Sequence, residues 1–290
     1  MTYPDPTLVH ALCEEGPRPV GSDAHARARS ILRSELERIG AMPYDGEAYD
    51  LPYDAAGTAF VNLVGEVPGE DPDLPPLVIG AHYDTVPTTP GANDNAASIA
   101  VALAVGERAS DAPLRRGLVL GLFDAEEPPY YHQPTMGSIR FVEDVLDARG
   151  VAAMVALDLI GRDPDVDELV AVLPTPVRLA LRVGLAGRLD RAIGVLGAED
   201  DRRWDGPVRA MQRATPGRYR PRRIPHAVAP DMSDHYAFRR AGWPYLFLSS
   251  GMGPTYHEPT DVPETLDGAR LDATTDALEG LLRSADDAFA

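Results

Sequence analysis

Short apolar segments alternate along this chain with segments that have helical features, and this alternation constrains the fold more than any other feature. The apolar segments are rich in Val, Leu, Ile and Ala and span residues 59–67, 76–83, 116–124, 151–161 and 244–250. Amphipathic or small-residue stretches, which we predict to be helices, lie at residues 23–40, 94–109, 136–150, 175–189 and 270–289. Apolar strands that alternate with helices are typical of a sheet covered on both faces. We therefore predict an α/β fold, a three-layer α/β/α sandwich around a mostly parallel mixed sheet.

The absence of a linker and the absence of lysine limit the number of domains and the kinds of catalysis that we expect. No Pro-, Gly- or Ser-rich linker divides the 290 residues, and no internal repeat is present, so we expect a single domain over residues 1–290. The chain contains no lysine, and all 27 basic residues are arginines. This excludes a lysine Schiff base for pyridoxal phosphate and the lysine of a phosphate-binding loop. Acid–base chemistry must fall to Glu, Asp, His or Tyr.

Charge, hydropathy and cysteine content exclude several kinds of partner. The formal net charge of -18 is unfavourable for binding nucleic acid. No stretch approaches the roughly 18 apolar residues of a membrane span, and the first residues lack the pattern of a signal peptide. Cys13 is the only cysteine; it fits a reducing compartment and is expected to be a buried hydrophobe. We expect a cytoplasmic protein without nucleic-acid or membrane partners and leave its oligomeric state open.

Metal-capable side chains follow the predicted strands at the points where these strands end. In parallel α/β sheets the loops at the carboxyl ends of strands lie together and bind ligands. The side chains at these places are His82, Asp84, Asp94, Glu126, Glu127, Asp158 and His257. We therefore expect them to meet at one edge of the sheet.

A chance arrangement of these side chains would be costly. Asp158 lies in an apolar run, where an unpaired carboxylate would cost several kcal/mol of desolvation. Several carboxylates that converge on one edge also repel one another unless cations neutralise them. Two imidazoles and three carboxylates suit two zinc ions with one carboxylate between them, whereas a single cysteine cannot build a closed Cys-rich structural site. The sequence thus predicts a catalytic metal centre.

Five motifs in order resemble the di-zinc aminopeptidases of metallopeptidase family 28, which also includes aminopeptidase Y and relatives of glutamate carboxypeptidase II. The motifs are GAHYD, GANDNAAS, FDAEE, ALDLIG and YHEPTD, and the segments RPVGSDAHARARSILRSELERIG and SDHYAFRRAGWPYLF resemble the family too. The resemblance runs from about residue 16 to 270 and is interrupted at 162–228. It implies a single zinc-peptidase catalytic domain with the zinc-exopeptidase fold, acting on peptide substrates.

The resemblance also implies a role for each side chain at the site. One zinc ion would be held by His82, Asp94 and Asp158, and the second by Asp94, Glu127 and His257, so that Asp94 bridges the two. Glu126 would be the general base for a metal-bridging hydroxide, and Asp84 would orient His82. The peptide bond between Asp94 and Asn95 would be cis.

The chain also departs from the family pattern. Ala97 and Ser98 stand where Ser-Gly is common. The segment PPYYHQPTM is inserted between the paired glutamates and Gly137-Ser138. We expect this insertion to line the substrate pocket with Tyr130, Tyr131 or His132, or else to be an ordinary surface loop.

Three other functions are associated with similar folds or motifs, and the sequence fits them less well. Glutaminyl cyclases share the fold and similar motifs but use a single zinc ion, so a glutaminyl-peptide cyclotransferase-like enzyme is the runner-up. Enzymes of metallopeptidase family 20 need a lysine and a lid domain for which this chain has no room. A binding scaffold on the same fold would have lost ligands that are present here.

An Arg-rich segment at 201–223 carries eight arginines and two acidic residues. It either binds an acidic substrate or partner or is a solvated surface. We expect the neighbouring His226 and His235 to be structural, whereas Asp234 and His235 could also support the site.

Overall fold

A single sheet organises the part of the chain that the structure describes. The structure is a computed structural model, and it describes residues 4–55, 57–146, 149–164, 192–197, 201–226 and 231–289. Within these ranges nine strands form one sheet in the order β1-β3-β5-β4-β6-β9-β7-β8, and β2 also pairs with β3. Their bounds are β1 Met42–Pro43, β2 Asp50–Ala55, β3 Thr58–Val67, β4 Leu77–His82, β5 Leu118–Phe123, β6 Ala153–Leu157, β7 Ala192–Leu196, β8 Arg220–Ile224 and β9 Tyr245–Ser249.

The centre of the sheet is parallel and its flanks contain antiparallel pairs. β5, β4, β6 and β9 run parallel to one another. β3 is antiparallel to β5, and β7 is antiparallel to β9. The predicted mixed sheet is therefore confirmed, with parallel pairing at its centre.

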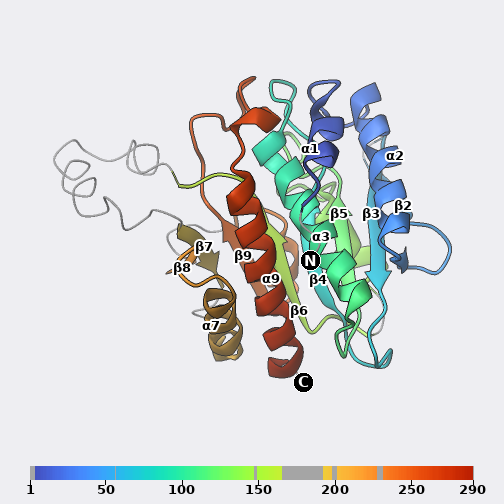
Figure 1. The fold of residues 1–290 in the computed structure, drawn as a ribbon. Helices are drawn as coiled ribbons and strands as arrows, with labels where there is room; N and C mark the ends of the chain where they lie inside the picture. The colour runs from blue at the N-terminus through green and yellow to red at the C-terminus, as the bar shows by residue number, and fades with distance from the viewer. Residues whose placement is uncertain are drawn as a thin grey trace.

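Helices cover both faces of the sheet, as the apolar strands predicted. Along β4, Leu77 and Ile79 belong to one hydrophobic core and Val78 to a second, because alternate side chains of a strand point to opposite faces. The first core is covered by α1 Pro6–Cys13, α2 Asp23–Arg38, α3 Ala97–Asp111 and α9 Gly268–Ala288, which lie side by side in front of the sheet in Figure 1. The second core contains residues of α4 Gly137–Arg140, of the π-helical turn η2 Phe141–Val145 and of α8 His235–Arg240. The α/β/α sandwich is thereby confirmed.

Several predicted elements differ from the observed ones in their bounds. The predicted helix at 94–109 begins with a π-helical turn, η1 Ala92–Ala96, before α3. The predicted helix at 136–150 ends earlier than predicted, at Val145, because Leu146 leaves the helix with ψ 116° and packs against the second core instead. The helix predicted at 175–189 lies outside the described residues. The sequence did not predict α1, β1, β2, β7, β8, α8 or α7 Asp205–Ala214.

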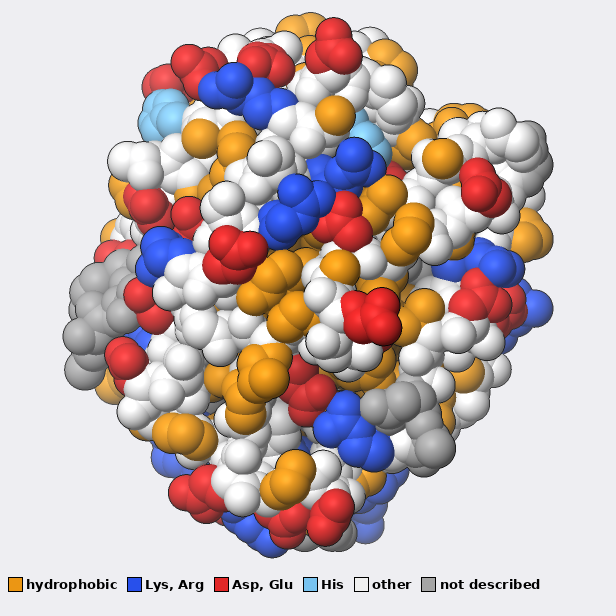
Figure 2. All heavy atoms as spheres, turned by 90° about the vertical axis from the view of Figure 1, so that its right-hand side faces the viewer, with side chains coloured by type: hydrophobic (Ala, Val, Ile, Leu, Met, Phe, Trp, Pro, Cys, Tyr) orange, Lys and Arg blue, Asp and Glu red, His pale blue; other side chains and the backbone are white. Residues whose placement is uncertain are grey.

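The surface mixes charges of both signs. On the face that carries α2 and β2, acidic and basic side chains are interspersed (Figure 2). Arg33 pairs with Asp50 at 2.6 Å, and Arg38 pairs with Glu35 at 2.8 Å. Exposed pairs of this kind contribute little to stability. Within the described ranges, no helix has both the length and the apolar character needed to cross a membrane.

Candidate metal centre and substrate pocket

The carboxyl ends of the central strands bring the predicted side chains together. His82 is the last residue of β4, and Asp158 directly follows β6. Glu126 and Glu127 lie in the loop after β5, and His257 lies in the loop after β9. The remaining member, Asp94, comes from η1, which precedes α3. The sheet thus places residues that are up to 175 positions apart in the sequence, from 82 to 257, at one edge.

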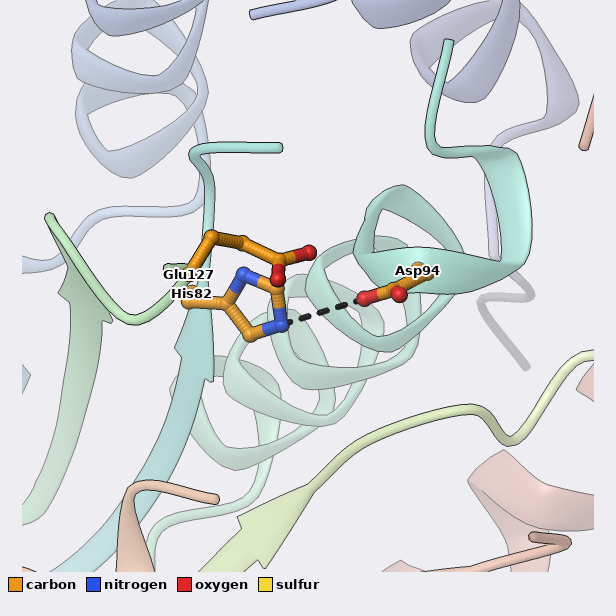
Figure 3. Close-up of side chains that lie close together, drawn as sticks. All are labelled: His82, Asp94 and Glu127. Atoms are coloured by element: carbon orange, nitrogen blue, oxygen red, sulfur yellow. Dashed lines mark ion pairs between the residues drawn. The ribbon is translucent and has the colours of Figure 1, made fainter. Parts of the chain in front are cut away.

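Asp94 occupies the middle of this cluster. Its Oδ1 lies 3.3 Å from His82 Nε2, and its Oδ2 lies 3.4 Å from His257 Nε2. In Figure 3 the ring of His82 and the carboxylate of Glu127 both point toward Asp94. A carboxylate with one oxygen toward each imidazole has the geometry of a bridging ligand.

Two groups of donors surround the two oxygens of Asp94. On the His82 side, Asp158 Oδ1 lies 3.8 Å from His82 Nε2. On the His257 side, Glu127 Oε2 lies 3.1 Å from His257 Nε2. One donor atom each of His82, Asp94 and Glu127 also lies within 4.8 Å of the other two. Each group combines one imidazole with carboxylates, which is a donor set typical of zinc.

The buried donor atoms test whether this set fits a metal ion. One atom of each of the five candidate ligands is buried and has no hydrogen-bond partner among the described residues: His82 Nε2, Asp94 Oδ2, Glu127 Oε1, Asp158 Oδ1 and His257 Nε2. Buried polar atoms normally have partners, because an unpaired one costs about 1–3 kcal/mol. A cation coordinated by these atoms would satisfy them and neutralise the carboxylates together. The residues therefore fit a divalent metal ion.

The electrostatics of the cluster lead to the same conclusion. Burial would raise the pKa of Asp94, but the nearby imidazoles of His257 and His82 outweigh burial and lower this pKa to about 2. Burial would lower the pKa of His257, but Asp94 and Glu127 raise it to about 10. Burial raises the pKa of Glu126 well above its usual value. In the protein alone, protons on the imidazoles balance the carboxylates, and a divalent cation would displace them.

Asp84 supports the loop that carries the two glutamates. Its Oδ1 accepts a hydrogen bond from the backbone N–H of Glu126 at 3.1 Å, and its Oδ2 accepts one from Glu127 at 3.0 Å. Its Oδ1 also lies 3.5 Å from His82 Nδ1, and its carbonyl oxygen lies 3.2 Å from the same nitrogen. Asp84 therefore lies where it can orient His82, as predicted, and its shorter carboxylate contacts hold the loop after β5.

A second buried carboxylate, missed in the sequence analysis, supports the loop that carries Asp94. Asp261 accepts backbone N–H bonds from Asn93 at 3.0 and 3.1 Å and from Asp94 at 3.1 Å. Asn93 in turn accepts from the backbone N–H of Gly161 at 2.8 Å. The peptide bond between Asp94 and Asn95 is cis, as predicted. The motif YHEPTD ends with Asp261, so its position in that motif was the available signal.

Arg18 was also missed. Its fully buried guanidinium donates to the carbonyl oxygens of Tyr83 at 3.0 Å and Gly91 at 3.2 Å. These residues lie at the start and near the end of the loop that leads from β4 to η1. Arg18 thus holds the connection between His82 and Asp94, and its signal in the sequence is the motif RPVGS.

A pocket of about 230 Å³ opens beside the cluster. The carboxylates of Asp94, Glu126, Glu127 and Asp158 form one side, and the remaining lining is mostly apolar: Pro128, Tyr131, Leu159, Met232, Phe247, Ser249, Met252 and Tyr256. Of the three insertion residues considered above, Tyr131 alone lines this pocket. Tyr130 packs edge-on against Phe60 at 5.2 Å, and His132 stacks on Tyr131 at 4.0 Å.

Two other predicted regions lie away from the pocket lining. His235 is fully buried and stacks on Phe247 at 4.6 Å, and burial lowers its pKa to about 3, so it is a neutral packing residue. Asp234 is buried, and burial raises its pKa to about 7. In the Arg-rich segment, Arg203 pairs with Asp201 and Arg223 with Asp205, both at 2.6 Å, and none of its residues lines the pocket.

Two curated proteins match part of the chain. The uncharacterised Escherichia coli protein YfbL is 32% identical over 113 residues, which are 36% of this chain and 34% of that protein. The vacuolar membrane protease of Lachancea thermotolerans is 42% identical over 66 residues, which are 23% of this chain and 7% of that protein. The chain thus matches about a third of the first protein's length and a small part of the second.

Solved structures match the whole fold. The zinc aminopeptidase BSAP from Bacillus subtilis superposes with a TM-score of 0.70 at 14% identity, over 96% of this chain and 93% of that one. Porphyromonas gingivalis glutaminyl cyclase superposes with a TM-score of 0.72 at 19% identity, over 96% of both chains. At these identities the likeness shows the fold alone. The sequence model of peptidase family M28 matches residues 62–282, a range that contains all seven predicted site residues. The chain therefore belongs to peptidase family M28.

Proposed function

We propose that this protein is a zinc-dependent exopeptidase that removes the N-terminal residue from peptides. The observation that carries the proposal is the pocket of about 230 Å³, which ends at the carboxylates of Asp94, Glu126, Glu127 and Asp158. None of its described lining residues is basic. With Asp94, Glu127 and Asp158 neutralised by the metal ions, the carboxylate of Glu126 would still attract a positively charged α-amine, whereas no described lining residue could pair with the α-carboxylate of a C-terminal residue. This charge pattern supports an aminopeptidase over a carboxypeptidase.

Two zinc ions are part of the proposal. His82, Asp94 and Asp158 would hold one ion, and Asp94, Glu127 and His257 would hold the other. When bound, zinc lowers the pKa of water toward neutrality and stabilises negative charge on a substrate carbonyl oxygen. The contacts of Asp94 with both imidazoles, at 3.3 and 3.4 Å, support two ions that share this carboxylate.

Glu126 is the proposed general base. It lines the pocket, is 5% exposed, and its Oε2 lies 3.8 Å from His82 Nε2. From this position its carboxylate would take the proton of the attacking water and pass it to the departing amine. Asp84 fixes the backbone of Glu126 and Glu127 together, so that one glutamate can bind metal while its neighbour moves the proton.

A single-zinc glutaminyl cyclase is the second candidate. Several solved structures of glutaminyl cyclases share the fold. The imidazoles of His82 and His257 on opposite oxygens of Asp94 favour two metal ions instead. Both candidates act at the N-terminus of a peptide, so the choice rests on the reaction catalysed.

A substrate panel separates these functions. The zinc-loaded protein would be incubated with a leucyl anilide, its N-acetylated form, a peptide with a free C-terminus and an N-blocked end, and a peptide that begins with Gln. The proposal predicts that the free-amine anilide is cleaved and that both N-blocked substrates are not. Cyclisation of the Gln peptide without cleavage of the anilide would establish the cyclase instead. Release of C-terminal residues from the N-blocked peptide would establish a carboxypeptidase.

A further inference from the structure

The insertion after the paired glutamates supplies a wall of the substrate pocket. We propose that Tyr131 determines specificity: its ring, held in place by Asp231, limits the pocket to an N-terminal residue with a compact apolar side chain. This inference rests on the proposed function and goes beyond it, because it names the class of N-terminal residue and the side chain that selects it.

Tyr131 is tied to a segment far away in the sequence. Its hydroxyl donates a hydrogen bond to the carbonyl oxygen of Asp231, and His132 Nε2 lies 2.8 Å from the same oxygen. The ring of His132 stacks between Tyr131, at 4.0 Å, and Tyr236, at 4.1 Å. Arg239 in turn binds the carboxylate of Asp231 through two hydrogen bonds of 2.6 and 2.7 Å. These contacts hold the insertion against the segment 231–239. The ring of Tyr131 is therefore held in a defined position beside the pocket.

The two adjacent tyrosines of the insertion have different surroundings. Tyr131 lines the pocket, together with Met232 from the segment to which it is tied. Tyr130 is not among the lining residues and packs edge-on against Phe60. The insertion therefore offers a matched pair of neighbouring tyrosines, one that contacts the pocket and one that does not.

The chemistry of the pocket defines what it can accept. Beyond the carboxylate side, the lining is formed mainly by Leu159, Met232, Phe247 and Met252 together with the rings of Tyr131 and Tyr256. An anionic side chain would lose its hydration there without gaining a basic partner among the described lining residues. The volume of about 230 Å³ lies below the range of about 300–1,000 Å³ typical of pockets for drug-sized ligands. It suits a compact side chain such as that of Leu or Met better than the indole of Trp.

The test compares variants of the two tyrosines in the zinc-loaded protein. Tyr131→Ala, Tyr131→Phe, Tyr130→Ala and Tyr130→Phe would be assayed with leucyl, phenylalanyl and tryptophanyl anilides. Binding of free L-leucine and L-tryptophan would be measured in parallel by calorimetry, as a readout independent of turnover. We expect Tyr131→Ala to lower the Leu-to-Trp ratio of kcat/KM at least about tenfold, the effect of a few methylene groups in an apolar pocket. The ratio of the two dissociation constants should shift in the same direction.

Tyr131→Phe and the two Tyr130 variants serve as controls for Tyr131→Ala. Tyr131→Phe keeps the ring and loses only its bond to Asp231, so we expect a shift of about two- to fivefold in the Leu-to-Trp ratio, equivalent to a neutral hydrogen bond at the lower end of its usual strength. Both Tyr130 variants should keep the wild-type ratio. A ratio within twofold of wild type in Tyr131→Ala, by both kinetics and binding, would overturn the inference. If wild-type protein itself cleaves no free-amine anilide, the proposed function fails, and that outcome is distinct from an active enzyme with unaltered selectivity.

Discussion

The two halves of the candidate metal centre differ in how the fold builds them. His82 is the last residue of a central parallel strand, and its side chain is 1% exposed. His257 lies in a loop with φ 59°, and its side chain is 28% exposed. The carbonyl oxygen of His257 accepts a bond from Thr88 Oγ1 at 2.8 Å, and its ring stacks on Tyr256 at 3.8 Å. One half is thus part of the sheet, whereas loop contacts hold the other.

We expect this difference in structure to make metal binding stronger on the His82 side and easier to alter on the His257 side. On the side of Asp94 that carries His82 and Asp158, strand pairing and burial hold the ligands in place. A surface substitution would not alter these interactions. The His257 half depends on a few local contacts that can be altered one at a time. We therefore expect the ion on the His257 side to be the more easily lost.

The largest effect is expected from removing the residue that both halves share. Asp94→Ala should lower the metal content from two ions per chain toward zero and abolish peptidase activity, because each ion would lose a ligand. Metal content after dialysis would be measured by plasma mass spectrometry, with the melting temperature as a check on folding. A folded variant that retains both ions would contradict the bridging role.

Substitutions of the two adjacent glutamates should distinguish an effect on catalysis from an effect on metal binding. Glu126→Gln should keep the metal content and lower kcat by about 10²–10⁴, the usual contribution of a positioned general base. Glu127→Gln, its matched control, should instead weaken binding of the ion on the His257 side. Near wild-type turnover in Glu126→Gln would remove the base assignment.

Substitutions of His82 and His257 directly compare the two sides of the candidate metal centre. His257→Ala should leave one ion bound on the His82 side, whereas His82→Ala should also destabilise the fold, since it leaves a cavity and unpaired carboxylates at a fully buried position. Metal content and thermal unfolding of both variants would be compared with those of His10→Ala, a histidine whose side chain is 58% exposed. Equal metal loss and equal destabilisation in the two variants would contradict the difference between the halves.

The smallest effect is expected from a contact that supports the His257 loop. Thr88→Val keeps the side-chain shape and removes the hydrogen bond to the carbonyl oxygen of His257, a loss of about 0.5–1.5 kcal/mol. This should weaken the more labile ion about two- to tenfold and leave the other unchanged. Competition with a chromophoric chelator measures both affinities, and an equal change in both would argue that the halves are not independent.

The grouping of the candidate metal ligands could be predicted from the sequence, because these residues lie at or near the ends of apolar strands. The central strands are apolar throughout, so their ends, and the polar residues that follow them, are visible in the sequence. The structure accordingly brings His82, Asp94, Glu127, Asp158 and His257 together. Their roles as ligands stay predictions, as does the division of the chain into one domain.

The parts that could not be predicted depend on tertiary contacts. β8 has the sequence RPRRI and is largely exposed, so its strand character comes from pairing with β7 rather than from its own pattern. α8 has six residues, too few to be stable alone, and is held by the second core. Asp261 and Arg18 act on backbone groups of distant loops, a function that their side-chain type does not reveal.

The most direct test of the account is a crystal structure of the zinc-loaded protein with anomalous data collected at the zinc edge. We expect two anomalous peaks, one among His82, Asp94 and Asp158 and the other among His257, Asp94 and Glu127. One peak, or none, in crystals grown with ample zinc would contradict a shared carboxylate between two ions.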